Sequence, residues 1–136
     1  MSKQVPIIPQ HQTIDSAGAD LICNVETSEL WIEPGETVVI PTGSYVPNNI
    51  PKNIFLGLYI RSSIAFKKTV FLSNSVGVID RDYEDEIKVL FTNYGDDVVT
   101  IKQGERIAQL VAQPYYNCFP VKSNRRTGGF GSSDAD

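Results

Sequence analysis

Short apolar stretches separated by turn-forming residues recur along the whole chain, and helical periodicity is nearly absent. Stretches of a few residues rich in Val, Ile, Leu, Phe and Tyr are typical of β-strands. Strands are expected near Asp20–Val25, Leu30–Ile32, Thr37–Thr42, Phe55–Ile60, Val70–Leu72, Glu86–Asn93, Val98–Ile101, Arg106–Pro114 and Cys118–Lys122. Turns are expected at Pro34-Gly35, Pro47-Asn48-Asn49, Gly95-Asp96-Asp97 and Gln103-Gly104. This spacing predicts an all-β sandwich, jelly roll or barrel.

One short helix is expected from Ser62 to Lys67, directly after an apolar strand. Ser62 is a suitable N-cap, which would leave free N–H groups facing outward. Arg61-Ser62-Ser63 therefore combines an arginine, two hydroxyls and a helix start, and is a candidate phosphate site. A serine that merely caps a helix is the commoner explanation.

The composition is that of one soluble domain. The chain has 136 residues, of which 41% are hydrophobic and 21% charged, and its formal charge is −4. This charge argues against a nucleic-acid partner, so a polyanionic ligand would need local Arg and Lys or a metal ion. No apolar stretch has the length of a membrane span, and residues near the N-terminus of this sequence do not form a basic region followed by an apolar run. We therefore expect a cytoplasmic protein without a membrane partner.

Cysteine and histidine provide little chemistry. Cys23 and Cys118 are the two cysteines, fit no metal-ligand spacing and lie in strand-like sequence, so both are expected to be buried free thiols. His11 is the single histidine, which disfavours a zinc site and a histidine-based nucleophilic triad.

Three further segments carry candidate chemistry. Between Gly77 and Glu86 an apolar run stops at Asp80, and Tyr83 follows, so a possible general base lies beside a flat apolar surface. Asp20 enters a strand after a small-residue turn, either as a turn acid or as a carboxylate that orients metal-bound water. Arg106 and Gln109 are three residues apart, so they cannot share a face of a regular strand.

The composition changes after Asn124. The remaining residues, 125–136, contain Gly, Ser and Asp with Phe130 as the single large apolar residue. We expect a β core over 1–124, followed by a segment over 125–136 that is mobile when no ligand is bound. Arg125 offers a fork for phosphate oxygens, and Phe130 between glycines could stack on a base.

Taken in order, these five segments resemble the five motifs of the trimeric dUTPase family, the dUTP diphosphatases, from Ala17 to Ser133. The resemblance implies a distorted β jelly roll and a homotrimer whose active sites lie between subunits. It also implies hydrolysis of dUTP to dUMP and pyrophosphate with Mg²⁺, which limits uracil incorporation into DNA. Asp80 would activate the water that attacks the α-phosphorus, Arg61 and Gln109 would contact phosphate and water, and Asp20 would contact hydrated Mg²⁺ indirectly.

The same resemblance assigns the nucleotide contacts. Tyr83 would pack against the deoxyribose and exclude a 2′-hydroxyl. Asn74, with the backbone of Gly77, Val78 and Ile79, would recognise uracil. Ser62 and Ser63 would contact phosphate. Arg125 would meet the γ-phosphate, Phe130 would stack over uracil, and Gly131, Ser132 and Ser133 would hold the terminal phosphate.

The chain departs from the family pattern at Asp85 and Arg126, where Gly is usual, and at Ser133-Asp134, where Thr-Gly is usual. A Gly at the first position often supports a positive φ. Two alternatives remain: a nucleotide-gated regulatory protein on the same fold, and a dCTP deaminase-like enzyme. The deaminase group usually carries Phe at the position of Tyr83 and lacks the Gly-Phe-Gly tail.

Overall fold

The computed structural model describes residues 5–124, which form β-strands and one short helix. The elements are β1 Gln10–His11, β2 Ala19–Ile22, β3 Glu29–Ile32, β4 Thr37–Ser44, β5 Ile54–Ile60, α1 Ser62–Lys67, β6 Val70–Leu72, β7 Gly77–Ile79, β8 Ile87–Asn93, β9 Val99–Lys102 and β10 Arg106–Pro114. This confirms the all-β prediction and its single helix. No helix in this part of the chain is both long and apolar enough to cross a membrane.

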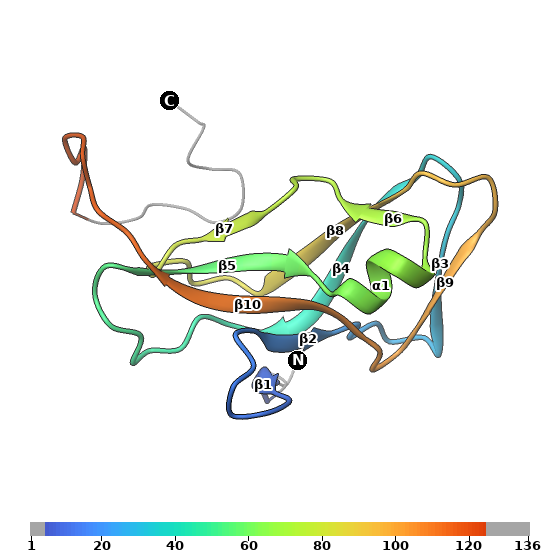
Figure 1. Cartoon of the computed structure of the whole chain (residues 1–136), viewed down its shortest axis with the longest axis horizontal. Coiled ribbons are helices and arrows are strands. Elements are labelled where there is room, and N and C mark those ends of the chain that lie inside the picture. Colours follow the sequence, from blue (N-terminus) through green and yellow to red (C-terminus); the bar gives the residue numbers. More distant parts are fainter. Residues whose placement is uncertain (1–4, 125–136) are drawn as a thin grey trace.

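Antiparallel pairing arranges the strands in three sheets. The largest has the order β1-β2-β10-β5-β7, a second has the order β4-β8-β6, and β3 pairs with β9 alone. The first two lie across one another, while β3 and β9 form the end of the molecule beside α1 (Figure 1). Lys68, which follows α1, donates a 2.7 Å hydrogen bond to the Thr100 carbonyl of β9 and so holds this end together.

The core lies between the two larger sheets and follows from strand periodicity. In β8, Ile87, Val89 and Phe91 are fully buried, because alternate side chains of a strand point to the same face. From the other sheet, β2 and β10 contribute buried Leu21 and Ile107 to the same cluster. A polar residue, Asn93, is also fully buried, and its amide donates to the carbonyls of Ile32 and Asp97.

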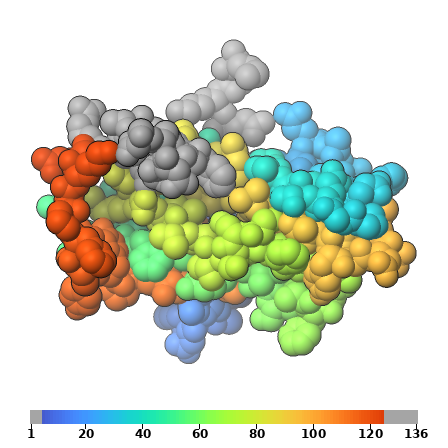
Figure 2. Space-filling view, turned by 90° about the horizontal axis from the view of Figure 1, so that it is seen from above, coloured from blue at the N-terminus to red at the C-terminus, as the bar shows by residue number. Residues whose placement is uncertain are grey.

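The prediction of a strand near Cys118–Lys122 is wrong. Residues 115–124 form no strand and run along the edge of the molecule (Figures 1 and 2). Tyr116 and Phe119 are 91% and 84% exposed. Strand-forming composition needs a partner strand to become a strand, and residues 115–124 pair with none.

The sequence pattern did not predict two of the strands, and it predicted a third strand to be longer than it is. β1 consists of polar Gln10 and His11, and β7 has three residues, so neither carries a periodic signal. The strand expected over Asp20–Val25 ends at Ile22, since Cys23 and Asn24 pair their N–H groups with Glu105 and Pro41 outside the ladder. The turns at Pro34-Gly35 and Gln103-Gly104 are confirmed, with φ of 77° at Gly35 and 82° at Gly104.

The two cysteines differ in environment, which corrects one expectation. Cys23 is buried as expected, but Cys118 is exposed because its segment forms no strand. Burial raises the pKa of the Cys23 thiol, and the Glu105 carboxylate adds to the rise against an opposing hydrogen bond with the Val25 backbone. The Cys23 thiol is therefore protonated at neutral pH.

We expect a thiol reagent to modify Cys118 quickly and Cys23 only after unfolding. The thiolate is the reactive form, so burial and a raised pKa both protect Cys23. Titration with a chromogenic disulfide at pH 8 measures the number of reactive thiols before and after denaturant is added. Cys118→Ser is the control, and rapid modification of the native Cys118→Ser protein would contradict the burial of Cys23.

Candidate functional site

Residues from three segments far apart in sequence form a polar cluster at one end of the largest sheet. Asp20 of β2 lies directly opposite Gln109 of β10 in the antiparallel ladder, and Arg61 follows β5. Asp20 is only 9% exposed, and its Oδ1 lies 3.2 Å from Nε of Arg61. Asp20 is thus a strand residue with a buried charge and not a turn acid.

The guanidinium of Arg61 is fixed from several sides. Its Nη1 donates to Ser63 Oγ and to the Arg106 carbonyl, each at 3.2 Å, while its Nε faces Asp20. Such multiple anchoring pre-organises an arginine for a phosphate ligand, because little side-chain freedom remains to be lost on binding. The structure thereby brings together Asp20, Arg61, Ser63 and Gln109.

The helix start differs from expectation in its cap. α1 begins at Ser62, as predicted, but its N-cap is Arg61, and no side chain makes a cap hydrogen bond. The cap carbonyl instead accepts from the N–H groups of Ile64 and Ala65. Ser62 is exposed.

Gln109 rests against a glycine. Gly18 is buried, and a Cβ added there would lie 2.9 Å from Cβ and Cδ of Gln109, closer than such atoms normally approach. The Gln109 amide also makes a long 3.4 Å hydrogen bond to the Ile60 carbonyl. The small residues before Asp20 therefore make room for the Gln109 side chain.

Gly18→Ala is expected to lower turnover by roughly ten- to a hundredfold, since displacing a positioned side chain by about 1 Å has an effect of that size. The melting temperature should fall as well, because Gly18 is buried and the added methyl group would press on Cβ of Gln109, which moves only with the strand backbone. Steady-state kinetics and thermal unfolding measure the two effects. Ala17→Ser, at an exposed neighbour, is the matched control, and equal rates for both variants would contradict the role of this contact.

A second group of candidate residues surrounds the turn after β7. Asp80 follows this strand and is exposed, and its carbonyl accepts a 3.1 Å hydrogen bond from the Tyr83 N–H. Tyr83 is 9% exposed, and its hydroxyl donates to the Glu86 carbonyl at 3.0 Å. A rigid, buried aromatic is thus held three residues from an accessible carboxylate, as expected.

Asn74 and Gly77 meet at the opposite end of β7. A Cβ on Gly77 would lie 3.6 Å from the Asn74 amide nitrogen and 3.0 Å from Cβ of Leu58. Gly77 is buried, and its lack of a side chain lets Leu58 of β5 pack against the backbone of β7. Val78 and Ile79 continue the strand, with Val78 exposed.

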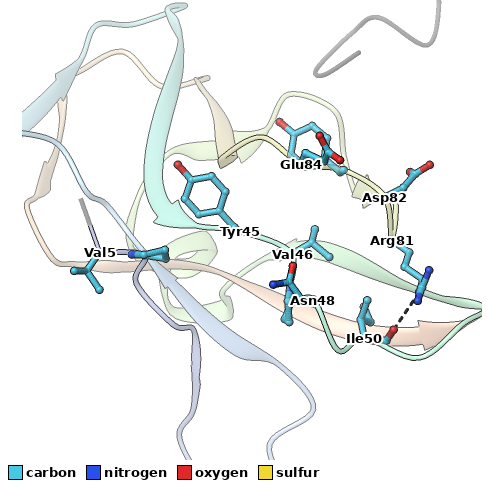
Figure 3. Close-up of a pocket in the computed structure, with 11 residues that line it drawn as sticks. Val5, Tyr45, Val46, Asn48, Ile50, Arg81, Asp82 and Glu84 are labelled. Atoms are coloured by element: carbon cyan, nitrogen blue, oxygen red, sulfur yellow. Dashed lines mark hydrogen bonds between the residues drawn. The ribbon is translucent and has the colours of Figure 1, made fainter. Parts of the chain in front are cut away.

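A cavity of about 800 Å³ lies against Tyr83 and was not expected from sequence. Residues 45–48, 50 and 81–84 line it, together with Val5 and Pro6 (Figure 3). Arg81 spans this region and donates from Nε to the Ile50 carbonyl at 3.0 Å. No motif points to Arg81 or to the 45–50 loop, because their proximity depends on the tertiary fold.

The two groups lie at opposite ends of β5. Ile79 pairs with Leu56 near the start of that strand, whereas Arg61 follows its last residue. Asp80 and Arg61 are therefore separated by roughly 20 Å along the sheet, at about 3.3 Å per residue. One chain does not bring Asp80 and Tyr83 to Arg61 and Gln109.

The assignments to Arg125, Phe130, Gly131, Ser132 and Ser133, and the departures at Arg126 and Asp134, lie outside the described residues.

A resident metal cage is absent from residues 5–124, which contain no group of three or more His, Cys, Asp or Glu side chains suited to a metal ion. Asp20 Oδ2 is buried without a hydrogen-bond partner in this part of the chain. Its two oxygens face Arg61 and Arg106, so Asp20 fits an indirect contact, through water, with Mg²⁺ that is held mainly by substrate phosphates.

The departure at Asp85 does not strain the backbone. Among the described non-glycine residues, positive φ angles occur at Asn53 and Ser75, and Asp85 is not one of them. The left-handed conformation that a Gly at this position often supports therefore does not occur at Asp85.

Comparison with known proteins shows which family the chain resembles. The family model described as dUTPase matches residues 5–134. A deoxyuridine 5′-triphosphate nucleotidohydrolase of Desulfitobacterium hafniense is 39% identical over 137 residues, covering 96% of this chain and 89% of its own. One from Pseudomonas syringae pv. tomato is 40% identical, covering 93% and 86%.

Solved structures show the same fold. The crystal structure of a dUTPase from Streptococcus mutans matches with a TM-score of 0.71 at 33% identity, covering 83% of this chain and 89% of that one. The dUTPase of Staphylococcus bacteriophage 80alpha matches with a TM-score of 0.73 at 21% identity, covering 90% and 92%, a likeness that concerns the fold alone. The motifs, their placement and these relatives together show that the chain belongs to the dUTPase family.

Proposed function

We propose that this protein hydrolyses dUTP to dUMP and pyrophosphate. The observation that carries the proposal is an accessible carboxylate, Asp80, held by a tight turn beside the buried ring of Tyr83. The relatives named as deoxyuridine 5′-triphosphate nucleotidohydrolases support the same substrate. The reaction would limit uracil incorporation into DNA and supply dUMP, and it would take place in the cytoplasm or, for a viral protein, inside the host cell.

Asp80 acts as the general base in this proposal. Its carboxylate orients a water molecule and accepts a proton as the water oxygen attacks the α-phosphorus, and the bond to the bridging oxygen breaks to release pyrophosphate. Arg61, Ser62, Ser63 and Gln109 position the phosphate chain, with Arg61 already anchored by Asp20. Bound Mg²⁺ would neutralise phosphate charge, with Asp20 contacting its water shell.

Selection of the nucleoside falls to β7 and the turn after it. The Tyr83 ring, fixed by its hydroxyl bond to Glu86, leaves no room for a 2′-hydroxyl on the sugar. Asn74 and the backbone of Gly77, Val78 and Ile79 recognise uracil by hydrogen bonds, and the nearness of the Asn74 amide to Gly77 supports this role.

We further propose a distorted jelly roll that assembles as a homotrimer. The separation of Asp80 from Arg61 along β5 supports an active site shared between subunits. The distribution of charge also supports contact between the Asp80 end of one subunit and the Arg61 end of another. Residues 80–86 contain five carboxylates. A cavity of about 520 Å³ at the other end is lined by four cations and one carboxylate: Arg61, Lys67, Lys68, Arg106 and Glu105. Val39 and Phe71, 56% and 45% exposed on the outward face of β4-β8-β6, offer apolar contact area.

The C-terminal residues complete the proposal as a separate lid segment, 125–136, beside the core of 1–124. Arg125 would bind the γ-phosphate, Phe130 would stack on uracil, and Gly131, Ser132 and Ser133 would hold the terminal phosphate. A phosphate-binding arginine and a stacking aromatic in one short segment support this role.

The test is pyrophosphate release with Mg²⁺ from dUTP, dTTP, UTP and dCTP, with ammonia monitored in parallel. Release from dUTP alone is expected. Turnover of UTP at a similar rate would remove Tyr83 as the sugar selector. Tight dUTP binding without turnover would indicate the regulatory alternative, and ammonia from dCTP would indicate the deaminase alternative.

A further inference from the structure

Arg106 lies on the same face of the sheet as Asp20 and Gln109, although its sequence position places it on the other face. On a regular strand, residues 106 and 109 point to opposite sides, because side chains alternate with period 2. The pairing of β10 with β2 contains a register shift between Arg106 and Ala108, where Arg106 pairs with Ile22 and Ala108 with Leu21. This irregularity has the effect of a β-bulge, which redirects one side chain across a sheet.

Burial along β10 agrees with the irregularity. Ile107 and Ala108 are both fully buried, whereas regular alternation would expose one of them. With the extra residue accommodated there, Arg106 lies beside Ile22, two residues along β2 from Asp20. A diagonal contact across neighbouring strands is within the reach of an arginine side chain.

The redirected Arg106 side chain faces the buried carboxylate of Asp20. Asp20 Oδ2 is buried and has no hydrogen bond within residues 5–124, and Nη1 of Arg106 lies 3.7 Å away. A buried carboxylate oxygen is costly unless a cation or a donor faces it. The Arg106 side chain is 46% exposed, so its own burial contributes little to the core.

The backbone at the same irregularity also forms a hydrogen bond with Arg61. The carbonyl of Arg106 accepts from Nη1 of Arg61 at 3.2 Å, so the backbone at this point anchors the second arginine. Asp20 therefore sits between two arginines, Arg61 on Oδ1 and Arg106 on Oδ2. Any change in the charge or orientation of Asp20 is transmitted to Arg61.

We propose that Arg106 is a positioning residue for dUTP hydrolysis, which keeps the Asp20 carboxylate oriented and through it holds Arg61 in place for the phosphates. The inference rests on the proposed function, but it concerns a residue that contacts Asp20 rather than the reacting atoms. Without Arg106, Asp20 would pair with Arg61 alone, and both side chains could rotate away from their present positions.

The test compares Arg106→Met, Arg106→Lys and the matched control Lys102→Met, whose side chain is exposed on β9. We expect Arg106→Met to lower kcat by about tenfold or more, as small displacements of positioned groups do. KM should change less. The melting temperature should fall modestly, because Asp20 loses one of the two cations that face it. Arg106→Lys should recover part of kcat, because it restores the cation, and Lys102→Met should leave kcat unchanged.

A double-mutant comparison isolates the route through Asp20. In an Asp20→Asn background, Arg106→Met should cause little further loss, since the carboxylate that it positions is gone. An undiminished loss in that background, or a kcat for Arg106→Met within twofold of the wild type, would overturn the inference. So would a parallel fall in melting temperature and kcat that Lys does not rescue. A wild-type protein without dUTP turnover would instead refute the proposed function.

Discussion

Replacing Asp80 with Asn is expected to lower dUTP turnover by about three orders of magnitude, the size of effect that a positioned general base supplies. The amide keeps the shape of the carboxylate but cannot accept the proton of the attacking water. Asp80 is exposed and its turn is held by the backbone bond to Tyr83, so the fold should not change. Single-turnover hydrolysis and calorimetric binding of a non-hydrolysable dUTP analogue separate chemistry from affinity.

The neighbouring exposed carboxylate Asp82 provides the matched control for this variant. Asp82→Asn makes the same change in charge two residues away, so it should retain a rate within about twofold of the wild type, as is usual for surface substitutions away from the chemistry. If both variants lost activity equally, the effect would come from the charge of the acidic segment. If Asp80→Asn kept a normal rate, Asp80 would not be the base.

Two inactive variants, Asp80→Asn and Arg61→Met, are expected to restore activity when their chains are mixed. Asp80 and Arg61 lie at opposite ends of β5, so a shared site would take one from each of two subunits. Random mixing in a closed ring should then give about one quarter of the wild-type activity, because each intact residue is supplied in about half of the positions. Refolding the variants together and assaying dUTP hydrolysis measures the recovery.

Each variant refolded alone is the control, and both should stay inactive. The combined substitution in a single chain, mixed with Arg61→Met, is a second control, because no mixed site then contains both Asp80 and Arg61. Absence of recovery from the mixed variants would show that one chain supplies the whole site, against the geometry of β5.

Local pattern was sufficient where one strand face is buried. Ile87, Val89 and Phe91 alternate with exposed or partly exposed residues, and that alternation alone predicts β8 and its inward face. The turn that joins Asp80 to Tyr83 also depends on adjacent residues, whereas the roles of these two residues were assigned through the family resemblance. The prediction for Cys118–Lys122 was wrong because strand propensity does not say whether a free sheet edge is nearby.

Arg106 shows the limit most clearly. The sequence established that Arg106 and Gln109 could not share a face of a regular strand, but only the pairing with β2 resolved the conflict, by a register shift that turns Arg106 toward Asp20. The chain by itself determined the strand-rich fold, the inward faces and the order of the motifs, since these depend on periodicity and local composition. The tertiary structure decided which charges meet and which ends of β5 lie apart, because those depend on strand register, a non-local property.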